Sequence, residues 1–152
     1  MPAATATPAR PAPAPAVAPP VVSAPSHAGM DLGPRVSLPA AAPARTLDEF
    51  KKLSARRMVA GSPQYSFMGK PPPMMFGIVI VETEVNADGS VRNISVTRPP
   101  ANPDAASTAD IAVEAIRRGA PYGDMSRLPR PWKWSEVFLF NDKRQFKPRS
   151  LD

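Results

Sequence analysis

The sequence predicts an α+β fold, with a small three-stranded antiparallel sheet and packed helices behind a disordered segment. Two β-branched runs flank a turn at residues 86–89, which is the pattern of a β-hairpin. An alanine-rich segment with helical spacing covers residues 107–118, and an aromatic-rich run follows at residues 132–140. Prolines and alanines crowd the first 45 residues. These patterns together favour one small folded unit after a long spacer.

The proline content limits how much of the chain can join a core. The 152 residues include 22 prolines and only 8 glycines, and few large apolar side chains occur in residues 1–45. Such a segment cannot bury enough apolar surface to offset the entropy lost on ordering. We therefore expect residues 1–45 to be a disordered Pro/Ala-rich spacer and residues 46–152 to be the folded domain.

The hairpin is predicted from strands at residues 76–85 and 90–98. Odd-numbered residues from Val79 to Val85 share one face of the first strand, while Ile78, Ile80 and two glutamates share the other. In the second strand, Ile94 and Val96 lie on one face. Gly89 supplies a positive φ for the turn between them. The pair Pro99-Pro100 ends the second strand.

Two helices are predicted. Thr46 and Glu49 have the spacing of a capping box, which starts a helix at residues 47–60 with Leu47, Phe50 and Leu53 on its apolar stripe. The second helix spans residues 107–118, with Ser107 or Thr108 as its cap. Its predicted core face consists of Ile111, Ala112, Ala115 and Ile116. We expect both apolar stripes to pack on the sheet.

The chain offers no set of residues suited to common catalysis or to metal binding. It has no cysteine, and its one histidine, His27, lies in the expected spacer. Glu82 and Glu84 lie two apart on a strand, which is typical of a solvated face. No phosphate-binding glycine loop or dinucleotide motif occurs. We therefore expect no enzyme activity, no catalytic residues, no metal and no cofactor.

Charge and hydropathy say little about the partner. The net charge is +6, but no run of lysine and arginine exceeds two residues and no nucleic-acid-binding motif occurs. The longest apolar run, at residues 74–81, is too short to span a bilayer as a helix, and the start does not resemble a signal peptide. We expect neither nucleic-acid binding nor a transmembrane helix in this sequence.

Four segments in combination carry a family resemblance over roughly residues 60–145. They are the Gly-led strand at 77–81, the Val-Asn-Ala-Asp-Gly-Ser-Val hairpin at 85–91, the following Ile-Ser-Val-Thr at 94–97, and Ala-Val-Glu-Ala-Ile-Arg at 112–117. This combination resembles the TonB C-terminal domain family, and the Pro/Ala-rich segment looks like the spacer of that family. The resemblance implies a small α+β unit in the periplasm or cell envelope, with its membrane anchor outside this sequence.

The resemblance also implies a binding mode. Members of the family pair a strand with an extended peptide of an outer-membrane receptor, in energy-coupled transport. By position, the docking strand is the last one, and its partner-binding residues are Trp134, Ser135, Glu136, Val137, Phe138, Leu139 and Phe140. The partner is then a receptor or another envelope protein.

Three alternatives stay open at this point. The chain could be an envelope adaptor or assembly module that shares the fold without energy transduction. It could be a basic protein that binds an anionic polymer or nucleic acid. It could also be an enzyme of a kind that these patterns do not reveal. Self-association into a homodimer is compatible with each of them.

Overall fold

The structure is a computed structural model that describes residues 33–152. His27 and most of the expected spacer lie outside the described residues. The elements run in this order: α3 (Leu47–Gly61), η3 (Pro63–Tyr65), β1 (Gly77–Val85), β2 (Val91–Arg98), η4 (Pro103–Ala105), α4 (Thr108–Gly119), β3 (Lys133–Phe140), β4 (Phe146–Pro148) and η5 (Arg149–Leu151). The predicted α+β class is confirmed, and each predicted helix and strand is present to within a residue or two.

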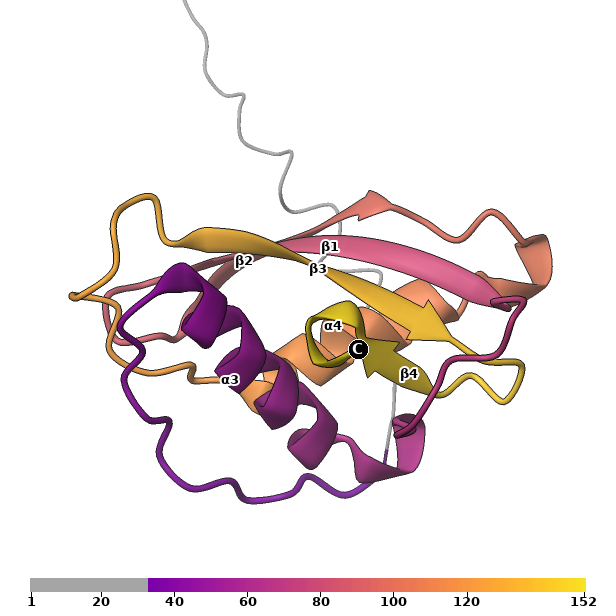
Figure 1. The fold of residues 1–152 in the computed structure, drawn as a ribbon, viewed down its shortest axis with the longest axis horizontal. Helices are drawn as coiled ribbons and strands as arrows, with labels where there is room; N and C mark the ends of the chain where they lie inside the picture. Colours follow the sequence, from indigo (N-terminus) through magenta and orange to yellow (C-terminus); the bar gives the residue numbers. More distant parts are fainter. Residues whose placement is uncertain (1–32) are drawn as a thin grey trace, which may run out of the picture.

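The sheet is antiparallel and has four strands, in the order β2-β1-β3-β4. The prediction of three strands is therefore wrong, because β4 adds a short fourth strand beside β3. Helices α3 and α4 both lie on one face of this sheet, with α3 packed along α4 (Figure 1). The fold has two layers, and the strand that was predicted to be last is in fact an interior strand.

The hairpin forms as its turn residues predict. The amide of Asn86 donates to the carbonyl of Ser90 at 2.9 Å, and Gly89 takes a φ of 86°. The carboxylate of Asp88 accepts from the amide and the hydroxyl of Ser90, which lowers the pKa of this exposed aspartate. These short-range bonds close the turn and set the register of β1 on β2.

Alternation along β1 places the core as expected. Its odd-numbered residues, from Gly77 to Val85, are buried, and its even-numbered residues are half-buried. The core below the sheet is completed by Phe138, Phe140 and Phe146, whose rings lie 5.3 to 6.5 Å apart between centroids. Aromatic rings from β3 and β4 therefore fill the core beneath the end of the sheet where the short strand β4 lies.

The first helix starts as predicted but turns a slightly different face to the core. The hydroxyl of Thr46 accepts from the amide of Glu49 at 3.1 Å, and Glu49 accepts from the amide of Arg45 at 2.7 Å. Leu47, predicted on the apolar stripe, is 45% exposed, whereas Phe50 and Met58 are buried. The buried stripe of this helix therefore begins at Phe50, about one turn after the predicted start.

The second helix is confirmed with a different start. The side chain of Ser107 makes no capping hydrogen bond, and the hydroxyl of Thr108 donates back to the carbonyl of Ala105 at 2.6 Å. The short turn η4 leads directly into α4 and replaces a side-chain cap. The four residues predicted to face the core are all buried: Ile111, Ala112, Ala115 and Ile116.

Residues 33–45, assigned to the spacer from composition, pack along the helices. The guanidinium of Arg57 donates to the carbonyl of Pro39 at 2.7 Å, and that of Arg118 donates to the carbonyl of Gly33 at 2.8 Å. Ala44 is only 3% exposed. The packed unit thus includes at least residues 33–45 as well as the predicted domain. Within the described residues, no helix has the length and apolar character needed to cross a bilayer.

Candidate partner-binding edge

The seven predicted site residues form most of β3, which the structure places inside the sheet. The whole of β3 pairs with β1, and Phe138, Leu139 and Phe140 also pair with β4. This second half of the strand already has neighbours on both sides and cannot accept another strand. The expectation of an open last strand is therefore wrong for residues 138–140.

Among the described residues, the first half of β3 pairs with a strand on one side only, and the turn η5 lies against its end at Glu136. The amide of Val85 donates to the carbonyl of Trp132 at 2.9 Å, and the register then alternates along the two strands. Backbone groups of even-numbered β3 residues point toward β1, and those of Lys133, Ser135 and Val137 point the other way. Lys133 and Ser135 are exposed and lie before the paired segment of β4. We call residues 133–137 the open half-edge.

The boundary of the open half-edge is fixed by the short strand β4. The turn before it is closed by a bond of 3.0 Å from the amide of Asn141 to the carbonyl of Gln145. On its far side, the carbonyl of Phe146 accepts from the amide of Phe67 at 3.0 Å. Because β4 is covered by residues 66–67, that part of the sheet edge is closed.

The buried carboxylate of Glu136 limits the open half-edge at the end nearer β4. Glu136 is 2% exposed, and its carboxylate accepts from the Ser150 hydroxyl at 2.8 Å and from the Ser150 amide at 3.2 Å. It also accepts from the amide of Val137 at 3.2 Å. The outward amide of Val137 is thus satisfied within the chain, and the amides of Lys133 and Ser135 are the two left for a partner.

Burial controls the titration of Glu136. Loss of hydration raises the pKa of this carboxyl above its usual value, while the hydrogen bonds from Ser150 and Val137 and the charge of Lys51 oppose the shift. The protonated form is therefore favoured in the folded state relative to the unfolded chain. Its contribution to stability is fully present below the unfolded-state pKa and is lost as the pH rises through the folded-state pKa.

We expect the variant Glu136→Gln to lack this loss of stability with rising pH. Relative to the variant, the wild-type free energy of unfolding should fall as the pH rises from about 4, near the ordinary glutamate pKa, into the range above the raised pKa. Urea unfolding of both proteins between pH 3.5 and 8 measures this difference. A difference that stays constant across that range would contradict the assignment, and Glu82→Gln on the half-buried face is the matched control.

The remaining predicted site residues divide by face. Trp134, Phe138 and Phe140 are buried in the core, and the Trp134 ring meets Phe50 edge-on at 4.7 Å between centroids. Ser135 is exposed and Val137 and Leu139 are half-buried on the opposite face. The side chains of the buried residues are therefore core groups, and only the backbone of this strand segment faces a partner.

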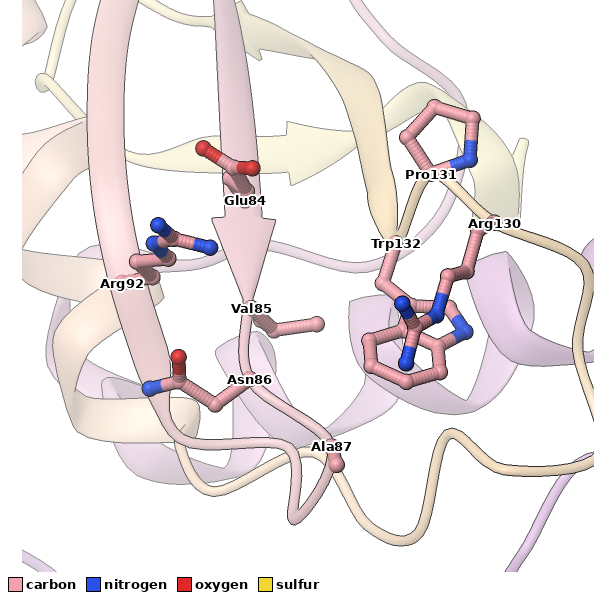
Figure 2. A pocket seen from close by; sticks show the side chains of 8 residues that line it. All are labelled: Glu84, Val85, Asn86, Ala87, Arg92, Arg130, Pro131 and Trp132. Carbon is pink, nitrogen blue, oxygen red and sulfur yellow. The ribbon is translucent and has the colours of Figure 1, made fainter.

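One feature that the sequence did not reveal is a hollow at the hairpin end of the sheet, between the end of β1 and the residues that lead into β3 (Figure 2). Its volume is about 550 Å³. Arg92 from β2 and Arg130 from the loop before β3 both border it. Its other lining residues are Glu84, Val85, Asn86, Ala87, Pro131 and Trp132. Lys133, at the start of the open half-edge, was also missed, although strand alternation alone places its amide beside that of Ser135.

The carboxylates considered for chemistry do not gather. Glu82 and Glu84 stay half-buried on the face away from the helices. Across residues 33–152, no group of three or more histidine, cysteine, aspartate or glutamate side chains could hold a metal ion. Comparison with protein-family models, curated proteins and solved structures finds no match to this chain.

Proposed function

We propose that this chain is a non-enzymatic binding domain of the bacterial cell envelope that captures an extended segment of a partner protein by β-strand addition. The observation that carries the proposal is the open half-edge of β3. There, two successive outward-facing residues, Lys133 and Ser135, are exposed in the part of β3 that pairs only with β1. An added strand would gain up to four backbone hydrogen bonds from them.

The opposite end of the sheet is a weaker candidate. There β2 is the outermost strand, and among the described residues no further strand limits its outer edge. The β3 edge has a defined length, because β4 and the Glu136–Ser150 bonds limit it. A limited edge favours capture of one short segment over open-ended sheet growth.

The envelope setting follows from the resemblance to the TonB C-terminal domain family. That assignment is supported by a Gly-led strand, an Asp-Gly hairpin and an alanine-rich helix. The binding mode that it implies is strand pairing. On this proposal the partner is an outer-membrane receptor or another envelope protein, and the domain acts in transport across the envelope. The same strand-addition step would serve an adaptor without energy coupling.

The proposal predicts that Ser135→Pro abolishes binding of an extended segment. Proline removes the outward N–H of residue 135 and carries a ring where the partner strand must lie, while the bonds from β3 to β1 come from even-numbered residues. The measurement is a titration of ¹⁵N-labelled protein with peptides from outer-membrane receptors, followed through the amide of Lys133 in every protein and through the amide of residue 135 in the proteins that keep it.

The control is Ser135→Ala, which changes the same side chain but keeps the N–H. It should bind like the wild type, and an unchanged amide spectrum away from β3 shows that Ser135→Pro is folded. If peptide binding shifts only residues of α3, or survives in a folded Ser135→Pro variant, the edge of β3 is not the docking site.

A further inference from the structure

We infer that a second hollow, between residues 38–42 and helix α3, binds a medium-chain aliphatic carboxylate. The tail of the ligand fills the hollow, and its carboxylate lies on Arg56 and Arg57 at the rim. This inference does not depend on the proposed function, because no residue of the sheet lines the hollow. It is carried by three observations: the shape of the hollow, its apolar walls and the charge at its rim.

The hollow lies where the segment ahead of α3 passes alongside that helix (Figure 1). Residues 38–42 form one wall, and Tyr122 lines it from the loop after α4. The other wall is one face of α3, whose lining residues recur at the helical spacing i, i+3, i+4 and i+7: Leu53, Arg56, Arg57 and Ala60. We call this space the α3 hollow.

The α3 hollow has room for a short hydrocarbon tail. Its volume is about 250 Å³, against about 150 Å³ for an apolar cavity that binds benzene, which leaves room for about eight to ten carbon atoms. Leu38 and Leu53 contribute half-buried aliphatic side chains to its walls. The Tyr122 hydroxyl donates to the carbonyl of Ile116 and is satisfied there. Ala40 and Ala60 are exposed, so a ligand can enter from solvent.

The rim of the α3 hollow is positively charged, and no acidic residue lines it. Arg57 is fixed at two points, because its Nε donates to the carbonyl of Gly119 and its Nη1 to that of Pro39, each at 2.7 Å. Among the described residues, neither Arg56 nor Arg57 takes part in an ion pair. The Nη2 group of Arg57 and the guanidinium of Arg56 are therefore available as donors.

These features select a ligand with one apolar tail and one negative group. A carboxylate is ionised at pH 7, and its two oxygens match the planar fork of a guanidinium. A tail of about eight carbons fills the hollow, whereas a lipid with two long chains exceeds it. A small inorganic anion would leave the hollow empty, and a neutral hydrocarbon would leave both arginines unused.

The test titrates the ¹⁵N-labelled full chain at pH 7 with butanoate, hexanoate, octanoate and decanoate. The amides of residues 40–42, Leu53 and Ala60 report binding. We expect the affinity to rise about fourfold for each added methylene up to octanoate, because each methylene moves from water into the hollow. Octanol has a tail of similar length without the charge, and it should bind roughly tenfold more weakly than octanoate.

Arg56→Gln tests the rim. Arg56 is exposed and makes no hydrogen bond within the described part of the chain, so its replacement leaves the packing intact. The variant should lose most of the tenfold preference for octanoate and bind octanol as the wild type does. The matched control, Arg98→Gln, removes the same charge from an exposed position at the end of β2 and should keep the preference. Equal losses in the two variants would mean that only the overall charge attracts the ligand, which overturns the inference.

Ala60→Leu tests the hollow itself. Leucine is a good helix former, and position 60 is exposed, so the helix should tolerate it. The larger side chain takes up part of the hollow, and the gain in affinity with tail length should then end near hexanoate. An unchanged dependence on tail length in this variant would show that the tails bind elsewhere.

Three further outcomes would overturn the inference. If octanol binds as tightly as octanoate, the hollow accepts apolar groups regardless of charge, such as a side chain of a protein partner, and the ligand class is wrong. If the carboxylates shift amides throughout the core, they act as detergents. If none of them shifts residues 40–42, the hollow is not a binding site. None of these results bears on strand addition, which is followed at Lys133.

Discussion

Gly89→Ala is expected to destabilise the fold more than any other single change in the hairpin. A Cβ at position 89 would lie 2.3 Å from both the amide nitrogen and the carbonyl oxygen of Gly123. Gly89 also has a φ of 86°, where an alanine is strained. The carbonyl of Gly89 also accepts a hydrogen bond of 2.8 Å from the amide of Tyr122. Because this bond holds the neighbouring loop in place, the loop cannot move aside freely.

The combined cost is about 2–4 kcal/mol, from the unfavourable backbone conformation and the overpacking. That is a large share of the roughly 5–15 kcal/mol that stabilises a typical domain. Urea unfolding followed by circular dichroism measures it. Gly69→Ala is a matched control, since Gly69 has a φ of 90° but nothing within 4 Å of an added Cβ. Its expected cost is about 1 kcal/mol, and equal costs for the two variants would show that the contact with Gly123 does not form in solution.

Phe138→Ala should have an effect of similar size for a different reason. The Phe138 side chain is fully buried, and its ring contacts those of Phe140 and Phe146 at centroid distances of 6.5 and 5.3 Å. Truncation leaves a cavity that these rings cannot fill without leaving their own positions. The expected loss is about 3–5 kcal/mol.

The neighbouring residue provides the control for Phe138→Ala. Leu139 lies next in β3 but on the opposite, half-buried face of the strand. Leu139→Ala should cost about 1 kcal/mol, because little apolar surface loses its cover. Thermal unfolding of both variants gives the comparison. A loss for Leu139→Ala as large as that for Phe138→Ala would mean that the outer face of the sheet is covered in solution.

The parts of the fold that were predicted correctly depend on local chemistry. The hairpin follows from alternation and from a turn that needs a positive φ, which Gly89 supplies. Helix α4 follows from its apolar spacing and from Asp110, Arg117 and Arg118 at the ends where the helix dipole favours them. In each case the residues that specify the structure lie within a few positions of one another.

The fourth strand was missed because its signals are not local. It has three residues, one of them Pro148, and the turn before it has no glycine. Instead, Arg144 takes a φ of 60°. Its side chain donates to the carbonyl of Asp104 at 3.1 Å and lies over the Phe76 ring, contacts from distant parts of the chain that support the turn. Only the folded structure shows such support.

The sequence predicted which strand holds the candidate site, but not which backbone groups of that strand are open to a partner. Alternation placed Glu136 on the same face as Trp134 and Phe138, yet a glutamate in that row gave no sign that Ser150 would cover it. The limit at Val137 depends on that contact and on β4. The hollow between Arg92 and Arg130 joins residues 38 positions apart in sequence, so it also required the tertiary structure.

The packing of residues 33–45 has a mechanical consequence. This segment is held by carbonyl contacts to Arg57 and Arg118, by an ion pair of Arg35 with Glu114 and by burial of Ala44, and none of these contacts is a bond between strands. A pull on the chain ahead of residue 33 would break them one after another before it loaded any strand. The released residues 33–45 would span up to about 45 Å at 3.3–3.6 Å per residue. The chain would thus extend at low force while the binding edge stayed folded.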